Sequence, residues 1–281
     1  MLVGLRSRKH IAPFELLRPN SLADACRAYS RPGRVALMAG GLDLIDRLKA
    51  GEPMERVVHL AGVRELSGIR REGDCIAIGA LTTHADLAHS AVLAELLPDL
   101  PAVWRTIANP RVRYAGTIGG NLVSAMMHYD ACPALLALGA DAVAIDRSGA
   151  HLTLDLRALP ERNDIILGQV RVPAGPFQLR LLADRSLHPI VSVYLGASVE
   201  NGKVQSARIS VGCIYARPAA VELPVAGAPV ATLGSDAAEL VRVAVGPLPE
   251  PVTDGLANAA YRRRMVEVLA RRLLVKLGSQ P

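Results

Sequence analysis

Short apolar runs alternate with helical spacing along the first part of the chain. Residues 35–38 form a short apolar run typical of a buried strand, and residues 42–49 repeat apolar positions at helical spacing. A capping-box pattern at 21–24 marks the start of an earlier helix. Two further apolar runs, 57–60 and 76–78, are bounded by glycine or charged residues, and we expect antiparallel strands there. The pattern predicts a chain that begins with mixed strands and helices.

Turn signals divide the second half of the chain. A Gly-Pro pair at 175–176 marks a boundary. Beyond it, apolar alternation over 190–198 and 204–211 flanks an Asn-Gly pair, which favours a tight hairpin. Helical spacing then closes the chain at 237–245 and 261–277.

Composition places the chain among ordinary globular proteins. Its 281 residues are 51% hydrophobic and 21% charged, which excludes a disordered or collagen-like chain. The four cysteines, Cys26, Cys75, Cys132 and Cys213, form no CxxC pair, so we exclude zinc and iron–sulfur sites on this chain. No run of about 18 apolar residues occurs, and the basic segment 1–10 lacks the apolar core of a secretory signal. We therefore expect a reduced, cytoplasmic protein without a transmembrane segment.

Charge and motif spacing exclude several function classes. Lys+Arg 32 against Asp+Glu 26 gives a net charge of +6, and the densest basic cluster, Arg262 to Arg264, lies on the amphipathic closing helix. Aromatic residues make up only 3% of the chain, so stacking platforms for a nucleic acid are lacking. The histidines show no HExxH spacing and no GxSxG motif is present. We expect no nucleic-acid partner, no metal ligand and no catalytic nucleophile.

Two glycine-rich loops are the strongest candidates for ligand binding. They span residues 39–44 and 117–121, and each contains a Gly-Gly pair. Paired glycines let the backbone approach a ligand closely, and successive N–H groups can form an anion site. The first loop also opens a predicted helix, whose N-terminus favours phosphate. Neither loop is a GxGxxG or GxxxxGK[ST] motif, so from the residues alone a phosphate clamp and a pair of plain turns both remain open.

The order of several motifs resembles one known family across nearly the whole chain. The family is that of the FAD-binding medium subunits of molybdenum hydroxylases, which includes carbon monoxide dehydrogenase medium chains and the flavin domain of xanthine dehydrogenase. The segments that carry the resemblance are residues 14–25, 37–44, 78–87, 110–122, 133–140 and 261–264.

The resemblance implies a fold and a division into domains. It implies an α+β, vanillyl-alcohol-oxidase-type (PCMH-type) FAD-binding fold, followed by a domain with a three-stranded sheet and helices. The expected parts are an N-terminal FAD-binding lobe at 1–55, a larger FAD-binding lobe at 56–175 and a C-terminal medium-subunit domain at 176–281.

The resemblance also implies the residues that bind the cofactor. Two loops would hold the pyrophosphate and ribityl chain: Leu37, Met38, Ala39, Gly40, Gly41, Leu42, Asp43 and Leu44, with Thr117, Ile118, Gly119, Gly120 and Asn121. Asp130 falls where the family has a carboxylate for the adenosine ribose. Ile107 and Leu167 fall at apolar positions that line the cofactor, and Gln178 stands where relatives often have a lysine near the flavin.

The implied function is electron transfer through non-covalently bound FAD. In such complexes a small subunit carries two [2Fe-2S] clusters and a large subunit carries molybdopterin, and we expect a dimer of heterotrimers. This chain would take electrons from the clusters and pass them to an external acceptor. The carbon substrate and the acceptor stay open.

The chain departs from the family pattern at several positions. Leu42 replaces a common threonine, and the bulky segment 126–129 replaces small residues. His84 would serve as a structural or helix-capping residue or lie beside the flavin, and Tyr194 would pack in the core or cover the flavin. Two other functions stay open: an FAD-free scaffold subunit that binds partners, and a stand-alone flavin oxidoreductase.

Overall fold

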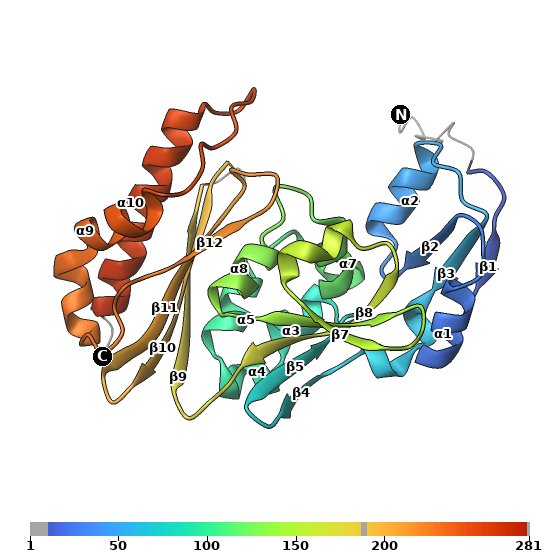
Figure 1. Cartoon of the computed structure of the whole chain (residues 1–281), viewed down its shortest axis with the longest axis horizontal. Coiled ribbons are helices and arrows are strands. Elements are labelled where there is room, and N and C mark those ends of the chain that lie inside the picture. The colour runs from blue at the N-terminus through green and yellow to red at the C-terminus, as the bar shows by residue number, and fades with distance from the viewer. Residues whose placement is uncertain (1–10, 187–189, 280–281) are drawn as a thin grey trace, which may run out of the picture.

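The chain folds into three lobes, each built around its own sheet. The computed structural model describes residues 11–186 and 190–279, so the basic segment 1–10 lies outside the described residues. Figure 1 shows the N-terminal lobe at one end, a central lobe, and a C-terminal lobe at the other end. The three sheets have three, five and four strands.

The N-terminal lobe is a small parallel sheet with two helices. Its strands have the order β1-β3-β2, and both neighbouring pairs are parallel. Ser21 caps the first helix by accepting a hydrogen bond from the Asp24 amide, as the capping pattern predicts. The elements are β1 (Glu15–Leu17), α1 (Leu22–Tyr29), β2 (Val35–Met38), α2 (Leu42–Lys49) and β3 (Arg56–His59).

The position of β3 corrects two expectations. The run at 57–60 was expected to be an antiparallel strand of the second lobe, but β3 pairs in parallel with β1 and β2. The boundary predicted at residue 55 is therefore too early. A short apolar run does not reveal its strand direction; here α2 provides the crossover that a parallel pair requires.

A shared hydrophobic core fixes the N-terminal lobe to the central lobe. Two 3-10 turns, η1 (Leu60–Gly62) and η2 (Arg64–Leu66), connect them. Leu66 is buried with Ala25 of α1 and with Ile166, which belongs to the central sheet. The two lobes therefore share one packed core.

The central lobe is an antiparallel sheet covered by short helices. The strands have the order β4-β5-β8-β6-β7, and the predicted strand at 76–78 lies within β5. The strands are β4 (Ile69–Glu72), β5 (Cys75–Gly79), β6 (Asp141–Asp146), β7 (His151–Leu154) and β8 (Ile165–Pro173). The helices are α3 (His84–His89), α4 (Ala91–Leu96), α5 (Asp99–Trp104), α6 (Pro110–Ala115), α7 (Ile118–Ser124), α8 (Ala131–Ala137) and the 3-10 helix η3 (Leu156–Glu161).

The C-terminal lobe is an antiparallel sheet between helices. The predicted hairpin is confirmed, because Asn201 and Gly202 both have positive φ at its tip. The three expected strands are β9 (Gln178–Arg185), β10 (Ser192–Glu200) and β11 (Lys203–Gly212), and the short β12 (Ala219–Glu222) extends the sheet at one edge. The helical elements are η4 (Val230–Thr232), α9 (Leu233–Val245) and α10 (Ala259–Gly278).

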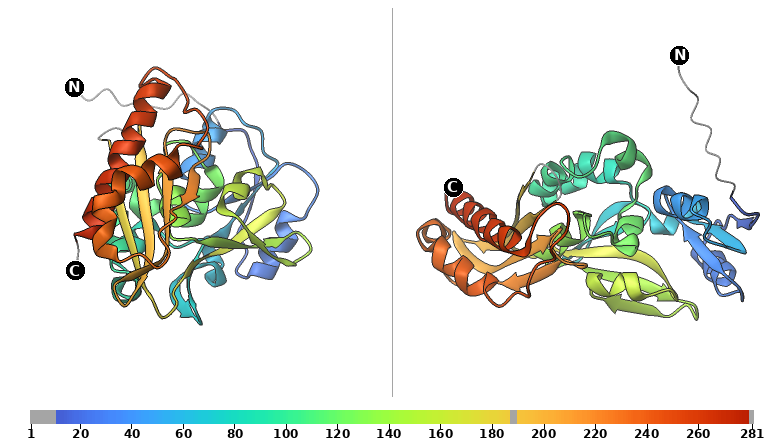
Figure 2. Two further views of the ribbon diagram at one scale, coloured as in Figure 1. Left: turned by 60° about the vertical axis from the view of Figure 1, so that its left-hand side comes forward. Right: turned by 90° about the horizontal axis from the view of Figure 1, so that it is seen from above.

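The C-terminal sheet lies between its own helices and the central lobe. The views in Figure 2 show α9 and α10 on the outer face of the sheet. On the inner face, Gly196 of β10 lies so close to α8 that a Cβ atom there would be 1.9 Å from the carbonyl oxygen of Ala137. Only glycine permits this approach, which seats the C-terminal sheet on α8.

Candidate functional site

The first glycine loop presents a run of free backbone N–H groups. Gly41 has φ +78 and forms the N-cap of α2, a conformation that favours glycine. The first helical hydrogen bond is donated by the Ile45 amide to the Gly41 carbonyl. Within the described residues, none of the six backbone N–H groups from Ala39 to Leu44 donates a hydrogen bond to a protein acceptor. We call residues 39–44 the amide run.

The structure brings the two glycine loops together. A Cβ atom on Gly40 would lie 1.8 Å from the carbonyl oxygen of Ala115, so the first loop rests directly on the backbone that leads into the second. A Cβ atom on Gly116 would lie 3.3 Å from Leu42 Cδ1. Because glycines occupy both sides, the backbones pack with no side chain between them.

The second loop does not present a run of free amides, which corrects the expected two-sided clamp. The Ile118 amide donates to the Thr82 carbonyl at 2.9 Å, and the Gly119 amide donates to the Ala80 carbonyl at 2.9 Å. The Gly120 amide donates to Thr117 Oγ1 at 3.1 Å, which caps α7. The Asn121 amide donates to the Thr117 carbonyl at 3.0 Å, so four of the five backbone donors of this loop serve the fold. Apart from the Thr117 amide, the loop offers a ligand only its side chains.

The two glycines of the second loop have different roles. A Cβ atom on Gly119 would lie 2.8 Å from both the Cβ and the carbonyl oxygen of Ala80, whereas one on Gly120 would meet only Thr117 Oγ1, at 3.1 Å. Gly119 is therefore required for packing, and Gly120 faces more open space.

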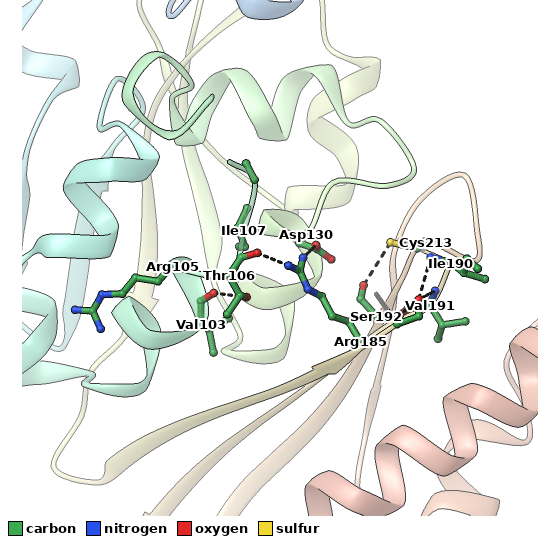
Figure 3. A network of polar contacts seen from close by, with 12 residues as sticks. Val103, Arg105, Thr106, Ile107, Asp130, Arg185, Ile190, Val191, Ser192 and Cys213 are labelled. Carbon is green, nitrogen blue, oxygen red and sulfur yellow. Dashed lines mark hydrogen bonds and ion pairs between the residues drawn. The ribbon is translucent and has the colours of Figure 1, made fainter. Parts of the chain in front are cut away.

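Asp130 lies at the contact between the central and C-terminal lobes. It is 5% exposed, and its Oδ2 atom lies 2.7 Å from Arg185 Nη1 at the end of β9. Figure 3 shows Arg185 between Asp130 and Thr106, to whose carbonyl it also donates. Burial and the Asp130 carboxylate raise the pKa of the adjacent Tyr194 well above its ordinary value. Tyr194 is 1% exposed, so of its two expected roles the structure shows core packing.

Unpartnered buried atoms concentrate in the predicted site. Over residues 11–186 and 190–279, three buried side-chain polar atoms lack a hydrogen-bond partner: Asn121 Oδ1, Asp130 Oδ1 and Arg262 Nε. The first two belong to the predicted cofactor set. Both are acceptors, which suit hydroxyl groups, whereas the amide run suits phosphate. The donor set therefore fits a ligand that carries a diphosphate and sugar-like hydroxyls, as FAD does.

The remaining predicted residues lie in two different places. Ile107 and Leu167 are 3% and 6% exposed and belong to the same central core. Gln178 is exposed at the start of β9, whereas Arg185, which reaches Asp130, ends that strand roughly 23 Å away. That Gln178 lies near the flavin stays a prediction. Arg180, two residues further along β9, pairs with Asp99 at 2.9 Å.

Sequence reasoning missed two residues around the loops. Ala115 and Gly116 form the contact with the first loop. The signal for these two residues was their place just before the second loop, but such a position does not say which neighbour closes the contact. Tyr129 belongs to the bulky segment 126–129 noted in the sequence: burial raises its pKa, and the carboxylates of Asp43 and Asp46 on α2 add to that effect.

His84 is buried beside the second loop. It is 2% exposed, and Trp104 Nε1 donates to its Nδ1 at 3.0 Å. Burial, with a contribution from Arg113, lowers the pKa of His84 to about 4. Thr83, not His84, caps α3. The imidazole is therefore neutral near pH 7.

Comparison with known proteins agrees with this geometry. The family described as the FAD binding domain in molybdopterin dehydrogenase matches residues 12–174. The chain belongs to this family. Its cofactor is FAD, and the matched segment contains both glycine loops and ends after β8.

Named relatives of this FAD-binding family cover almost the whole chain. The carbon monoxide dehydrogenase medium chain of Afipia carboxidovorans is 28% identical, over 92% of this chain and 94% of the relative. The 6-hydroxypseudooxynicotine dehydrogenase complex subunit alpha of Paenarthrobacter nicotinovorans is 30% identical, over 94% of each chain. These relatives are subunits of dehydrogenases, so this family member is a subunit of an oxidoreductase.

Solved structures of relatives share the fold. Reconstituted CO dehydrogenase from Oligotropha carboxidovorans has a TM-score of 0.83 at 26% identity and covers 97% of this chain and 100% of that chain. Quinoline 2-oxidoreductase from Pseudomonas putida 86 has a TM-score of 0.82 at 22% identity, over 96% of this chain and 98% of that chain. The expected α+β PCMH-type fold is confirmed. Of the helices in the described ranges, none has the length and hydropathy needed to cross a membrane.

Proposed function

We propose that this chain is the FAD-carrying medium subunit of a cytoplasmic molybdenum hydroxylase complex. It takes electrons from the [2Fe-2S] clusters of a small subunit and passes them to an external acceptor, while a large subunit carries molybdopterin. The expected assembly is a dimer of heterotrimers. One observation carries the proposal: the amide run of the first loop is free, and the loop lies directly against Ala115 and Gly116, which lead into the second loop.

The residues of this chain would bind and orient the cofactor. The amide run and the positive end of α2 hold the diphosphate. Asn121 Oδ1 and Asp130 Oδ1 accept hydrogen bonds from cofactor hydroxyls, which supplies the partners that they lack. When bound, FAD supplies the redox chemistry that no side chain provides.

The cysteines support the assignment of the clusters to a partner. Cys132 and Cys213 are buried, and burial raises their thiol pKa values to about 12 and about 11. Cluster ligation requires thiolates, which these environments disfavour. The names of the relatives, such as medium chain and medium subunit, also describe parts of larger assemblies.

FAD titration of the apoprotein tests the proposal. Wild-type protein should bind FAD with a flavin spectrum, and Leu42→Asp should weaken binding at least tenfold by placing a carboxylate beside the diphosphate. Because Leu42 is 43% exposed and begins α2, this change should alter the free energy of unfolding by less than about 0.5 kcal/mol.

Val243→Asp is the matched control. Val243 lies on α9 in the C-terminal lobe and is 47% exposed, so it adds the same charge away from the loops. Equal FAD affinity in the two variants would show that the amide run does not hold the diphosphate. Wild-type protein that does not bind FAD would favour the FAD-free scaffold subunit. A flavin-containing protein that purifies without cluster-bearing or molybdenum subunits would favour a stand-alone flavoprotein.

A further inference from the structure

The hydrogen bond between His84 and Trp104 fixes the protonation of the imidazole. The indole N–H is a donor only, so His84 Nδ1 accepts at 3.0 Å and the single ring proton of the neutral form lies on Nε2. Trp104 is fully buried and His84 is 2% exposed. The ring therefore presents a fixed N–H donor on the edge away from Trp104.

That edge of the ring lies where the two glycine loops meet. The His84 amide donates to the Gly116 carbonyl at 2.9 Å. His84 Cδ2, which neighbours Nε2 in the ring, lies 3.0 Å from the position that a Cβ atom on Gly116 would occupy. Leu42 Cδ1 lies 3.3 Å from the same position. His84 Cδ2 and Leu42 Cδ1 therefore approach the same point beside Gly116, and Leu42, the first residue of α2, belongs to the amide run.

The Nε2 donor has no partner in the described part of the chain. The His84 ring forms its hydrogen bond through Nδ1, which accepts from Trp104 Nε1. In the described residues, the polar side-chain atoms that lack both a partner and solvent contact are Asn121 Oδ1, Asp130 Oδ1 and Arg262 Nε. His84 Nε2 is not among them, so this unpartnered atom is not completely closed off from solvent. A nearly buried donor without a protein partner is expected to serve a ligand or water.

We propose that His84 Nε2–H donates a hydrogen bond to a diphosphate oxygen of the bound cofactor. The inference rests on the proposed function, because it takes FAD as the ligand of the amide run. His84 is a binding residue outside the two glycine loops, and Trp104 holds its ring in the donating tautomer. The neutral imidazole adds one more uncharged N–H donor to those of the amide run.

Two substitutions test the roles of the two ring nitrogens separately. In His84→Asn, the amide oxygen can stand near the Nδ1 position and accept from Trp104, but the Nε2–H donor is lost. In His84→Gln, the amide nitrogen can stand near Nε2, but the acceptor for Trp104 is lost. We expect His84→Asn to bind FAD about five- to tenfold more weakly with a nearly unchanged Tm.

His84→Gln should show the opposite result. Its FAD affinity should stay within about twofold of wild type, while its Tm falls because the Trp104 N–H is left buried without a partner. If His84→Asn binds FAD as tightly as wild type, the inference is wrong. The same holds if FAD affinity follows Tm across the two variants, because that would indicate a purely structural role.

NMR of the ¹⁵N-labelled imidazole identifies the cofactor group. The apoprotein should show the Nε2–H tautomer of His84, and FAD and ADP should both shift its Nε2–H signal, whereas riboflavin, which lacks phosphate, should not. An equal shift with riboflavin would overturn the assignment to a diphosphate oxygen. Wild-type protein that binds no FAD overturns both this inference and the proposed function, while wild-type binding with unaffected His84→Asn overturns this inference alone.

Discussion

At the scale of single residues, the candidate site depends more on backbone atoms than on side chains. Leu42 shows why this matters: its side chain lacks the hydroxyl expected from the family pattern, yet the amides around it are free. The sequence predicted this loop because glycine pairs are visible in a sequence. It could not show that the second loop uses its amides internally, since those hydrogen bonds join Ile118 and Gly119 to carbonyls far back in the chain.

Leu42→Thr should tighten FAD binding. The threonine hydroxyl adds one donor at the start of α2, so we expect the Kd to fall about two- to tenfold. Calorimetric titration of the apoprotein measures the change. Leu42→Val is the control, because valine has the shape of threonine without the hydroxyl. An improvement in Leu42→Val equal to that in Leu42→Thr would assign the gain to packing rather than to the added donor.

His84 should make folding stability depend on pH. Its pKa is about 4 in the folded protein and 6.5 in the unfolded chain, so between these values the unfolded state binds a proton that the folded state refuses. The free energy of unfolding should fall by about 3 kcal/mol as the pH drops from 6.5 to 4. Urea denaturation at pH 7 and pH 4.5 measures this loss.

His84→Asn supplies the reference for that measurement. It removes the titrating group and keeps an acceptor for Trp104, so its loss on acidification should be smaller than that of wild type by about 2 kcal/mol. Identical pH dependence in both proteins would show that the folded imidazole titrates normally.

Two residues mark the limit of sequence reasoning at this scale. Arg185 at the end of β9 forms an ion pair with Asp130, a contact that the sequence did not predict. The ion pair joins residues that are 55 positions apart in the chain, and no local pattern predicts such a partner.

At the scale of elements, local patterns predicted most helices and strands, but of the strand pairings only those between chain neighbours. The strand β2, the helix α2 and the β10–β11 hairpin were predicted, because each has its own local pattern. The parallel direction of β3 and the short strand β12 were missed, because pairing depends on the neighbouring strand rather than on the strand itself.

The glycines of α7 provide a test at this scale. Gly119→Ala should lower the free energy of unfolding by about 1–3 kcal/mol, because its Cβ would overlap Ala80. Gly120→Ala should be close to neutral, since the gain in helix propensity offsets a tight contact with Thr117 Oγ1. Urea denaturation of both variants measures the difference. An equal loss of unfolding free energy in the two variants would mean that α7 does not pack on Ala80 as described.

At the scale of the whole molecule, arginines of the C-terminal lobe hold it on the central lobe. Arg185 reaches Asp130 and Thr106, and Arg208 donates to the Leu136 carbonyl at 3.1 Å. The resemblance predicted a separate C-terminal domain, and the last strand of the FAD-binding match ends just before it. The contacts between lobes could not be predicted, because a surface arginine and an interface arginine look alike in a sequence.

Asp130→Asn should loosen this contact. It leaves Arg185 without its carboxylate, and because Arg185 is partly exposed we expect a cost of about 1–3 kcal/mol in the free energy of unfolding. Hydrogen exchange should also become faster in β9. Asp184→Asn is the control, since its pair with Arg272 is exposed and 3.9 Å long, and it should cost less than about 0.5 kcal/mol. Similar losses in both variants would contradict a special role for Asp130.

The contact of Gly40 with Ala115 has a consequence for how the protein is made. The amide run is translated early, but the backbone on which it rests follows only with Ala115 and Gly116, just ahead of the second loop. A growing chain that has just passed the first loop therefore offers half a binding site. Cofactor uptake on the ribosome must wait until α7 has emerged and folded against Ala80.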